Sequence, residues 1–242
     1  MLANMSTDYY ERIEQGRGPQ PSPSMLGAIA RALRLSLAER DHLYVLAGHP
    51  APEPNVSLGY ADPGLMTVLD ALAPSVPALI ADDIHNVVGQ NPLNVALLGK
   101  LVGESGFASN FLWHWFLDPD YELLYAPNDR EQLGRTYAAE LRAAAARRPD
   151  DPTVAVLVDE LRTRSADFSR MWDLNEVTAT TTTRKLLQHP RVGLLDCQCD
   201  VVISPPSQQR LVLFRGTPGT NTSEQLAVLQ VLGTQEFEPQ GT

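Results

Sequence analysis

The 242-residue sequence lacks any long uninterrupted hydrophobic run. A membrane-spanning helix needs roughly 18 or more consecutive apolar residues, so we expect no transmembrane helix and no membrane partner. The N-terminus also lacks a basic segment followed by an apolar one, which is the pattern of a secretory signal. We therefore expect a cytoplasmic location.

Cysteine is nearly absent, because Cys197 and Cys199 are the only two thiols. We expect them on opposite faces of one strand, unable to bond each other, and we interpret them as structural thiols. The five histidines show no HExxH or HxxxH spacing that would complete a metal site. GxSxG, Walker A and GxGxxG motifs are missing too. The sequence thus predicts no metal site, no catalytic residues and no enzyme activity.

An excess of positive charge is also missing. The formal net charge is −10, and residues 1–50 contain five basic and five acidic side chains. Proteins that act on nucleic acid often carry a basic excess, so composition alone argues against DNA binding, and a specific motif is needed to support it. The length fits one small and one medium domain, and the hydrophobic content of 43% suffices for a packed core.

The first fifty residues have the pattern of short helices with clear ends. The first is expected over Thr7–Gln15. Ser22 is placed to cap the second helix, with Pro23 at its first position, where a missing N–H costs nothing. Ser36 and Glu39 form a capping box at the start of a third. The N-terminal part is therefore predicted to be all-helical.

Residues 51–61 are rich in proline and lack periodicity, which predicts a linker. A helix then begins at Asp62-Pro63, and its partner surface could belong to either of the two domains. Strand patterns follow early at 78–83 and 84–91 and late at 177–187, 192–204 and 209–216. Helices are expected at 92–98, at 129–148, from Asp151 through Phe168, and at 223–232. This order predicts an α+β fold with a five-stranded antiparallel sheet and covering helices, and two early strands followed by three late ones is also the order of a PAS domain.

The stretch from Ser6 to Arg17, STDYYERIEQGR, resembles the recognition helix of the Xre-type helix-turn-helix family. The ending Ile-Glu-Gln-Gly followed by a basic residue carries this resemblance. A recognition helix presents its N-terminal residues to the major groove, and a basic residue just beyond it meets a phosphate. The residues implied to contact base edges are Thr7, Asp8, Glu11 and Arg12, with Arg17 at a phosphate.

The similarity extends over most of the chain to the MmyB-like transcription regulators. It is carried by residues 16–50 and by the stretches at 147–161, 165–172 and 189–196, which follow in the family's order. The resemblance implies a helix-turn-helix domain at 1–50, the linker at 51–61 and a PAS-like ligand-binding domain at 62–242. It also implies a homodimer on a two-fold DNA operator. The expected ligand is a small apolar molecule such as a fatty acid, and no other cofactor is expected.

One departure concerns the helix-turn-helix domain. A full domain of this type has two helices before the recognition helix, whereas only MLANM precedes Ser6. Two explanations fit this missing segment. The start site of the sequence is placed too late, or the domain is truncated and has lost autonomous DNA binding. The neutral charge of residues 1–50 favours the truncated domain. The alternative function is then a ligand-binding sensor or interaction module that acts through a partner.

The expected ligand pocket lies between the sheet and its covering helices. Apolar pockets with few polar groups suit a fatty chain, although the same side chains also build ordinary cores. Arg184 or Lys185 is placed to meet a carboxylate, and the sequence does not distinguish either from surface charge. The candidate lining residues are Leu93, Leu97, Trp113, Phe116, Trp172 and Leu213.

Overall fold

The computed structural model describes residues 17, 20–33, 35, 37–50, 61–102, 106–176, 183–205 and 207–235. The chain divides into two compact units, residues 1–55 and 56–242. The helix predicted at Thr7–Gln15, the cap at Ser36 and most of the linker at 51–61 lie outside the described residues.

The first unit contains α2 (Pro23–Ala32) and α3 (Leu37–Leu46). As predicted, α2 begins at Pro23, and the Ser22 hydroxyl accepts a hydrogen bond from the Met25 N–H at 3.4 Å. Leu26 of α2 and Tyr44 of α3 are buried, and the Tyr44 hydroxyl donates to the Pro23 carbonyl at 2.6 Å. A small apolar contact and one hydrogen bond thus join the two helices.

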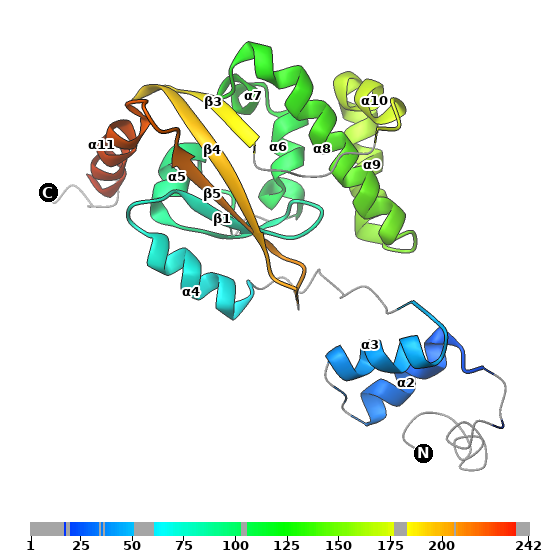
Figure 1. Ribbon diagram of the computed structural model, residues 1–242. Helices are drawn as coiled ribbons and strands as arrows, with labels where there is room; N and C mark the ends of the chain where they lie inside the picture. The colour runs from blue at the N-terminus through cyan, green and yellow to red at the C-terminus, as the bar shows by residue number, and fades with distance from the viewer. Residues whose placement is uncertain are drawn as a thin grey trace, which may run out of the picture. The chain divides into compact units, whose positions relative to one another are not determined.

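The second unit is built on one five-stranded antiparallel sheet with the strand order β2-β1-β5-β4-β3 (Figure 1). The prediction of an α+β fold with such a sheet is confirmed. The first and the last strands in sequence meet at the centre, because β1 pairs with β5. The strands are β1 (Ala78–Ala81), β2 (Val87–Gln90), β3 (Thr183–His189), β4 (Gly193–Ile203) and β5 (Arg210–Gly216).

One face of the sheet is covered by α4 (Pro63–Leu72) (Figure 1). Leu65 and Leu69 of this helix form a small core with Ile80 and with Leu211. The helix begins at Asp62-Pro63 as predicted, and Asp62 caps it, because its carboxylate accepts from the N–H groups of the first turn. The helix therefore belongs to the sheet-containing unit, which answers the question that the sequence left open.

The opposite face carries the larger core and most of the helices (Figure 1). The helix predicted from Asp151 through Phe168 is divided at Ser165. The Ser165 hydroxyl accepts from the Phe168 N–H at 3.1 Å, so it caps a new helix where the preceding one ends. The helices are α5 (Pro92–Leu98), η1 (Gly106–Ser109), α6 (Phe111–Leu117), α7 (Pro119–Leu123), α8 (Pro127–Arg147), α9 (Pro152–Arg164), α10 (Ala166–Asp173) and α11 (Thr222–Gln235).

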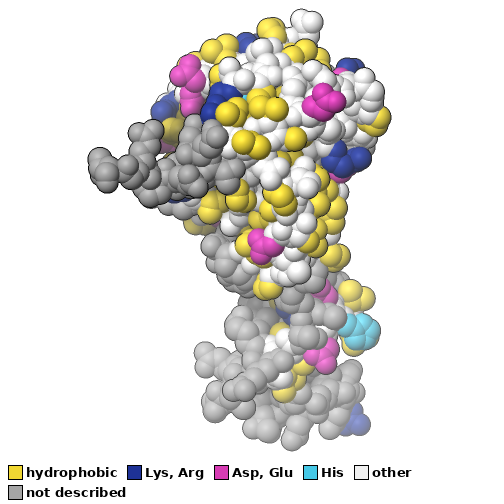
Figure 2. Space-filling model, turned by 90° about the vertical axis from the view of Figure 1, so that its left-hand side faces the viewer, with side chains coloured by type: hydrophobic (Ala, Val, Ile, Leu, Met, Phe, Trp, Pro, Cys, Tyr) yellow, Lys and Arg dark blue, Asp and Glu magenta, His cyan; other side chains and the backbone are white. Residues whose placement is uncertain are grey.

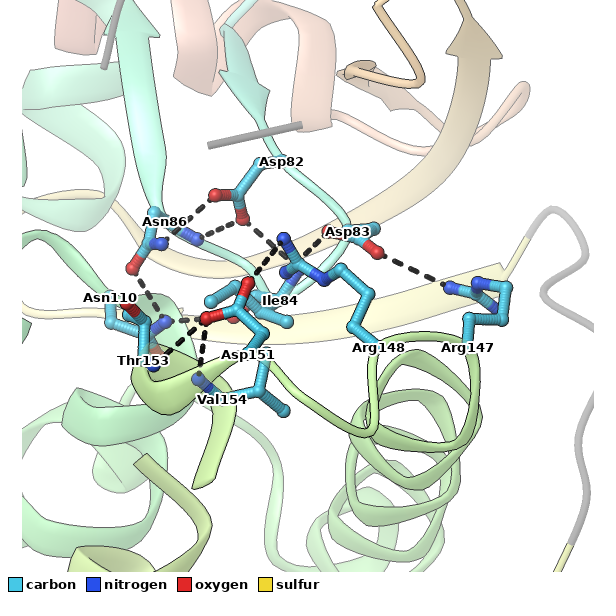
Figure 3. A network of polar contacts seen from close by, with 10 residues as sticks. All are labelled: Asp82, Asp83, Ile84, Asn86, Asn110, Arg147, Arg148, Asp151, Thr153 and Val154. Carbon is cyan, nitrogen blue, oxygen red and sulfur yellow. Dashed lines mark hydrogen bonds and ion pairs between the residues drawn. The ribbon is translucent and has the colours of Figure 1, made fainter. Parts of the chain in front are cut away.

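The longest of these helices, α8, is attached to the sheet at both ends. Just before its start, the Ala126 N–H donates to the Leu186 carbonyl of β3 at 2.9 Å. At its other end, Arg148 and Arg147 form ion pairs with Asp83 in the β1–β2 turn, at 2.9 and 3.5 Å (Figure 3). The side chains of Asp83 and Arg148 are only 9% and 8% exposed. The middle of α8 is thereby held above the sheet.

The β1–β2 turn is itself fixed by a polar network (Figure 3). The Asp82 carboxylate accepts from the N–H groups of Ile84 and Asn86 at 3.0 and 2.9 Å. Burial raises the pKa of Asp82, although these hydrogen bonds oppose the shift. Asn110, at the start of α6, donates to the Ile84 carbonyl at 2.7 Å, and Asp151 at the start of α9 pairs with Arg148 at 3.3 Å. The turn is thus tied to three helices.

Cys197 and Cys199 are free, buried thiols of β4. The prediction that they lie on opposite faces is wrong, because strand residues two positions apart share a face. Both belong to the larger core. Burial raises the pKa of Cys197 to about 12 and that of Cys199 in the same direction.

The surface near the C-terminal end carries apolar side chains on α11. Val228 and Val231 are 53% and 58% exposed. Figure 2 shows the side of the molecule on which α11 lies, where hydrophobic side chains are interspersed with separate charged groups. Among the residues that the structure describes, no helix is long and apolar enough to cross a membrane.

We predict that Asp83→Asn destabilises the protein by about 3 kcal/mol, because it leaves the buried guanidinium of Arg148 without its nearest carboxylate. Urea unfolding at neutral pH measures this loss. The double variant Asp83→Asn with Arg148→Met should recover part of it, whereas strictly additive losses would show that the pair is not coupled. Asp150→Asn, an exposed acid on the same corner, is the control and should stay within about 0.5 kcal/mol of wild type.

Candidate ligand-binding cavity

A cavity of about 360 Å³ lies between α8 and the inward face of the sheet. It occupies the space under the middle of α8, whose two ends are attached to β3 and to the β1–β2 turn. Its size falls within the range of small-molecule sites in proteins. The lining residues are Leu79, Ala81, His85, Phe111, Asp129, Gln132, Leu133, Thr136, Tyr137, Glu140, Arg184, Lys185, Cys199, Val201, Arg210, Val212 and Phe214.

The sheet supplies an apolar floor through strict alternation. Leu79 of β1 lies opposite Val212 of β5, and Val212 lies opposite Val201 of β4. Because successive strand residues point to opposite faces, these three side chains share the cavity side, and their neighbours in sequence face away. The strand pairing thus builds a continuous hydrophobic surface under α8.

Aromatic rings close one side of the cavity. Phe111 from α6 and Tyr137 from α8 lie edge to face with ring centroids 5.1 Å apart. Trp115 packs on Tyr137 from behind, at 5.0 Å. Edge-to-face pairs of this kind add stability beyond the apolar area that they bury. The wall is therefore aromatic and closely packed.

Lys185 of β3 brings a buried amine to this apolar cavity. The residue is 8% exposed, and its Nζ donates to the Tyr137 hydroxyl at 2.7 Å. The amine also lies over the rings of Tyr137 and Phe214, 5.2 and 5.9 Å from their centroids. Burial raises the pKa of Tyr137 well above its usual value, so this phenol stays neutral and keeps its proton.

A second polar group in the cavity wall is centred on Glu140 of α8. Its Oε2 lies 2.8 Å from His85 Nε2 and accepts from Arg210 Nη1 at 3.0 Å. The Glu140 side chain is 6% exposed, so its charge is compensated inside the protein. His85 has a φ of +68°, an uncommon conformation for a residue with a side chain, in the turn fixed by Asp82 and Asp83. The turn network thus helps to position this part of the wall.

A third cationic side chain, Arg184, lies at the cavity beside Lys185 but is mostly exposed. Its guanidinium donates to both carboxylate oxygens of Asp196, at 2.8 and 2.5 Å. Thr217 donates to the same carboxylate at 2.8 Å. The hydrogen bond from Arg184 has the largest effect and lowers the pKa of Asp196, and the bond from Thr217 acts in the same direction. Burial raises this pKa, but by less than the Arg184 bond lowers it.

The predicted DNA-contacting residues fall almost entirely outside the described residues. Arg17 is described and exposed. Nothing in the described part of the chain brings it together with another predicted contact. The four others, Thr7, Asp8, Glu11 and Arg12, lie in the segment that the structure does not describe.

None of the six residues predicted to line the pocket lines this cavity. Leu93 and Leu97 are buried in α5. The three aromatic residues belong to a layer formed by α6, α9 and α10, where Phe116 and Trp172 each pack on Phe168 and Arg164 lies over Trp113. Leu213 faces α4 on the opposite side of the sheet. Leu93, Leu97, Phe116 and Trp172 belong to the larger core rather than to the cavity lining.

The residues that do form the cavity carried a weaker signal in the sequence. Leu133 and Tyr137 are four residues apart, and this helical spacing places both on the apolar stripe of α8. Lys185 stands two residues before buried Leu187 in a strand, so alternation places its side chain on the inward face. The Glu140 group joins α8, β5 and a turn, and no local pattern indicates it. Within the described residues, no three His, Cys, Asp or Glu side chains gather as a metal ion would require.

We predict that Asp196→Asn lowers stability by about 0.5–1 kcal/mol at pH 7, a modest loss because its partner Arg184 is exposed and screened. The folded pKa lies below the unfolded value of about 3.9, so the carboxylate stabilises the fold above that pH. Its contribution is lost as the pH falls through the depressed folded pKa. Urea unfolding at several pH values should show the gap from wild type closing below pH ~4, while exposed Asp70→Asn shows no gap. A gap that is constant with pH would contradict this.

Comparison with known families connects this cavity to a ligand-binding domain. Residues 61–229, which contain the sheet, α8 and every residue of the cavity, match the family model for the MmyB-like transcription regulator ligand binding domain. Residues 1–43 match a helix-turn-helix domain. A search of curated protein sequences found no match. Because the first match covers more than half of the chain, the protein belongs to the family of MmyB-like transcription regulators.

Proposed function

We propose that this protein is a DNA-binding transcription regulator whose ligand-binding domain senses a small apolar molecule, such as a fatty acid, in the cavity beneath α8. The observation that carries this proposal is the cavity itself, which has a hydrophobic floor and an aromatic wall inside the matched ligand-binding domain. Sites for apolar ligands have this composition, with a few polar groups that orient the ligand. The strand order β2-β1-β5-β4-β3, with two early and three late strands, supports a PAS-like domain.

A regulatory role fits the chemistry of the cavity better than a catalytic one. Cys199 is the thiol that lines it, and burial raises its pKa, so the reactive thiolate is disfavoured. The carboxylate of Glu140 is already engaged by His85 and Arg210. Neither Cys199 nor Glu140 is therefore presented as an activated nucleophile.

For the DNA-binding unit, we propose that Thr7, Asp8, Glu11 and Arg12 face base edges and that Arg17 meets a phosphate. The match to a helix-turn-helix domain and the exposure of Arg17 support this. Proteins of this kind read two-fold sites as dimers, so we propose a homodimer acting on DNA in the cytoplasm.

The ligand part is tested by filling the cavity. Val201 lies on its floor, whereas Val202 is 49% exposed on the other face of the same strand. We predict that Val201→Trp weakens the binding of dodecanoic acid at least about tenfold by occupying the space of the ligand, and that Val202→Trp leaves binding unchanged. Isothermal titration and native mass spectrometry measure this. Failure of the wild-type protein to bind any apolar molecule would refute the ligand proposal.

The DNA part is tested by gel shift with the full chain on its own promoter. Arg17→Ala should weaken binding similarly on all sequences and reduce its salt dependence, because a phosphate contact carries no sequence information. Arg40→Ala is a control from the same unit, because its guanidinium pairs with Asp41. A chain that binds the ligand but shifts no promoter fragment would instead be a sensor that acts through a partner.

A further inference from the structure

The linker between the two units ends at the N-terminus of α4, where Asp62 caps the helix. Two further hydrogen bonds join Asp62 to the turn between β4 and β5. Its N–H donates to Gln209 Oε1 at 2.7 Å, and its Oδ2 accepts from the Ser204 hydroxyl at 2.7 Å. These partners lie 147 and 142 residues further along the chain. The end of the linker is therefore fastened to the sheet by the β4–β5 turn.

The β4–β5 turn is closed by hydrogen bonds of its own. The Ser204 N–H donates to the Gln209 carbonyl at 2.9 Å, and the Gln208 N–H donates to the Ser204 carbonyl at 2.8 Å. Gln209 is buried, with 3% of its surface exposed. A buried amide is costly unless it is hydrogen-bonded, so the bond from the Asp62 N–H stabilises this side chain. A change in the turn therefore changes how firmly Asp62 is held.

The same turn leads directly into the wall of the cavity. Arg210 follows Gln209, begins β5 and lines the cavity, and its guanidinium donates to Glu140 of α8 at 3.0 Å. Successive residues of a strand point to opposite faces of the sheet. Leu211 belongs to the small core beneath α4, so the alternation directs Arg210 toward α8. Two adjacent residues of the chain thus contact elements on opposite faces of the sheet.

The ion pair of Glu140 with Arg210 responds to what fills the cavity. Both side chains line it, and they are only 6% and 15% exposed. An apolar molecule in the cavity would displace water from beside this pair, and opposite charges attract more strongly in less polar surroundings. A stronger pair restrains Arg210, and it restrains the adjacent Gln209 through the backbone.

We propose that the β4–β5 turn couples the cavity to the linker. When an apolar molecule fills the cavity, the pair of Glu140 with Arg210 becomes stronger, and the turn holds Asp62 more firmly. Coupling between two sites requires an element with two states that both sites bias, and this element is the hydrogen bond from the Asp62 N–H to Gln209, closed or open. The proposal rests on the proposed function only in that the cavity must take up a small apolar molecule.

Hydrogen exchange of single amides, followed by NMR on the full chain, measures this hold, because the Asp62 N–H must leave Gln209 before it exchanges. We predict that saturating dodecanoic acid slows the exchange of this amide at least about fivefold, the lower end of typical couplings between sites. The Phe168 N–H, which Ser165 caps at the start of α10, is the control for general stabilisation and should slow less.

Two variants of the same strand test the route. Arg210→Met removes the cation that contacts Glu140, so we expect it to lose the selective slowing of the Asp62 amide at a dodecanoic acid concentration that saturates it. Arg215→Met removes another arginine of β5, which pairs with Asp200 instead, and should keep the slowing. Isothermal titration establishes saturation for each variant.

A second comparison needs no ligand. Glu140→Gln removes the charge that attracts Arg210, so we expect the Asp62 amide of the empty protein to exchange about fivefold faster relative to the Phe168 amide. Asp83→Asn loosens α8 at its other end and should leave the ratio of the two exchange rates unchanged. This control separates coupling through the turn from a general loss of stability, and Arg210→Met replaces Glu140→Gln if the latter does not fold.

The coupling and the proposed function fail in different ways. If wild type binds no apolar molecule, the proposed ligand function fails, and coupling to a ligand fails with it. If wild type binds dodecanoic acid but the Asp62 and Phe168 amides slow by the same factor, the ligand function stands and the coupling is overturned. Retention of the selective slowing in Arg210→Met, or the same exchange ratio in Glu140→Gln as in Asp83→Asn, would also overturn it.

Discussion

The sensing unit depends on the attachment of α8 at both ends. A backbone hydrogen bond to β3 fixes one end, and the ion pairs of Arg147 and Arg148 with Asp83 fix the other. Between these points the helix does not settle onto the sheet, because Tyr137, Glu140 and their partners occupy the space. On its outer side α8 is packed closely by α10, since a Cβ at Gly134 would stand 2.7 Å from the Met171 sulfur. The helix is held from both sides, and the cavity persists beneath it.

The polar groups of the cavity follow from the same arrangement. Glu140 must be compensated because it is buried, and Arg210 and His85 reach it from the sheet and from the turn. That turn is also the one that Asp83 attaches to the end of α8. The position of His85, the anchoring of the helix and the shape of the wall are therefore set by one network. In contrast, the Lys185 amine is supported, within the part of the chain that the structure describes, by the Tyr137 hydroxyl and by two aromatic faces.

Much of the fold could be predicted from local patterns, while the site could not. The proline-led starts of α4, α5 and α9 and the caps at Asp62 and Asp151 are determined within a few residues, so the sequence shows them directly. The pattern of two short strands early in the sequence and three late ones also suffices to predict an antiparallel sheet. The side of the sheet to which each strand residue points could not be predicted in this way, because it depends on long-range pairing. Leu213 is as hydrophobic as its neighbour Val212, and only the register places the first against α4 and the second in the cavity.

A cavity and an unmatched buried charge both lower the stability of the empty protein. Lining atoms lose packing partners, and an ammonium in apolar surroundings loses its hydration. A ligand that filled the space and met the charge would restore both, and it would bind the folded state alone, because the unfolded chain has no cavity. Its binding free energy is therefore added to the stability of the unit in proportion to its concentration. Under the proposed function, the stability of the unit would therefore report on the concentration of its ligand.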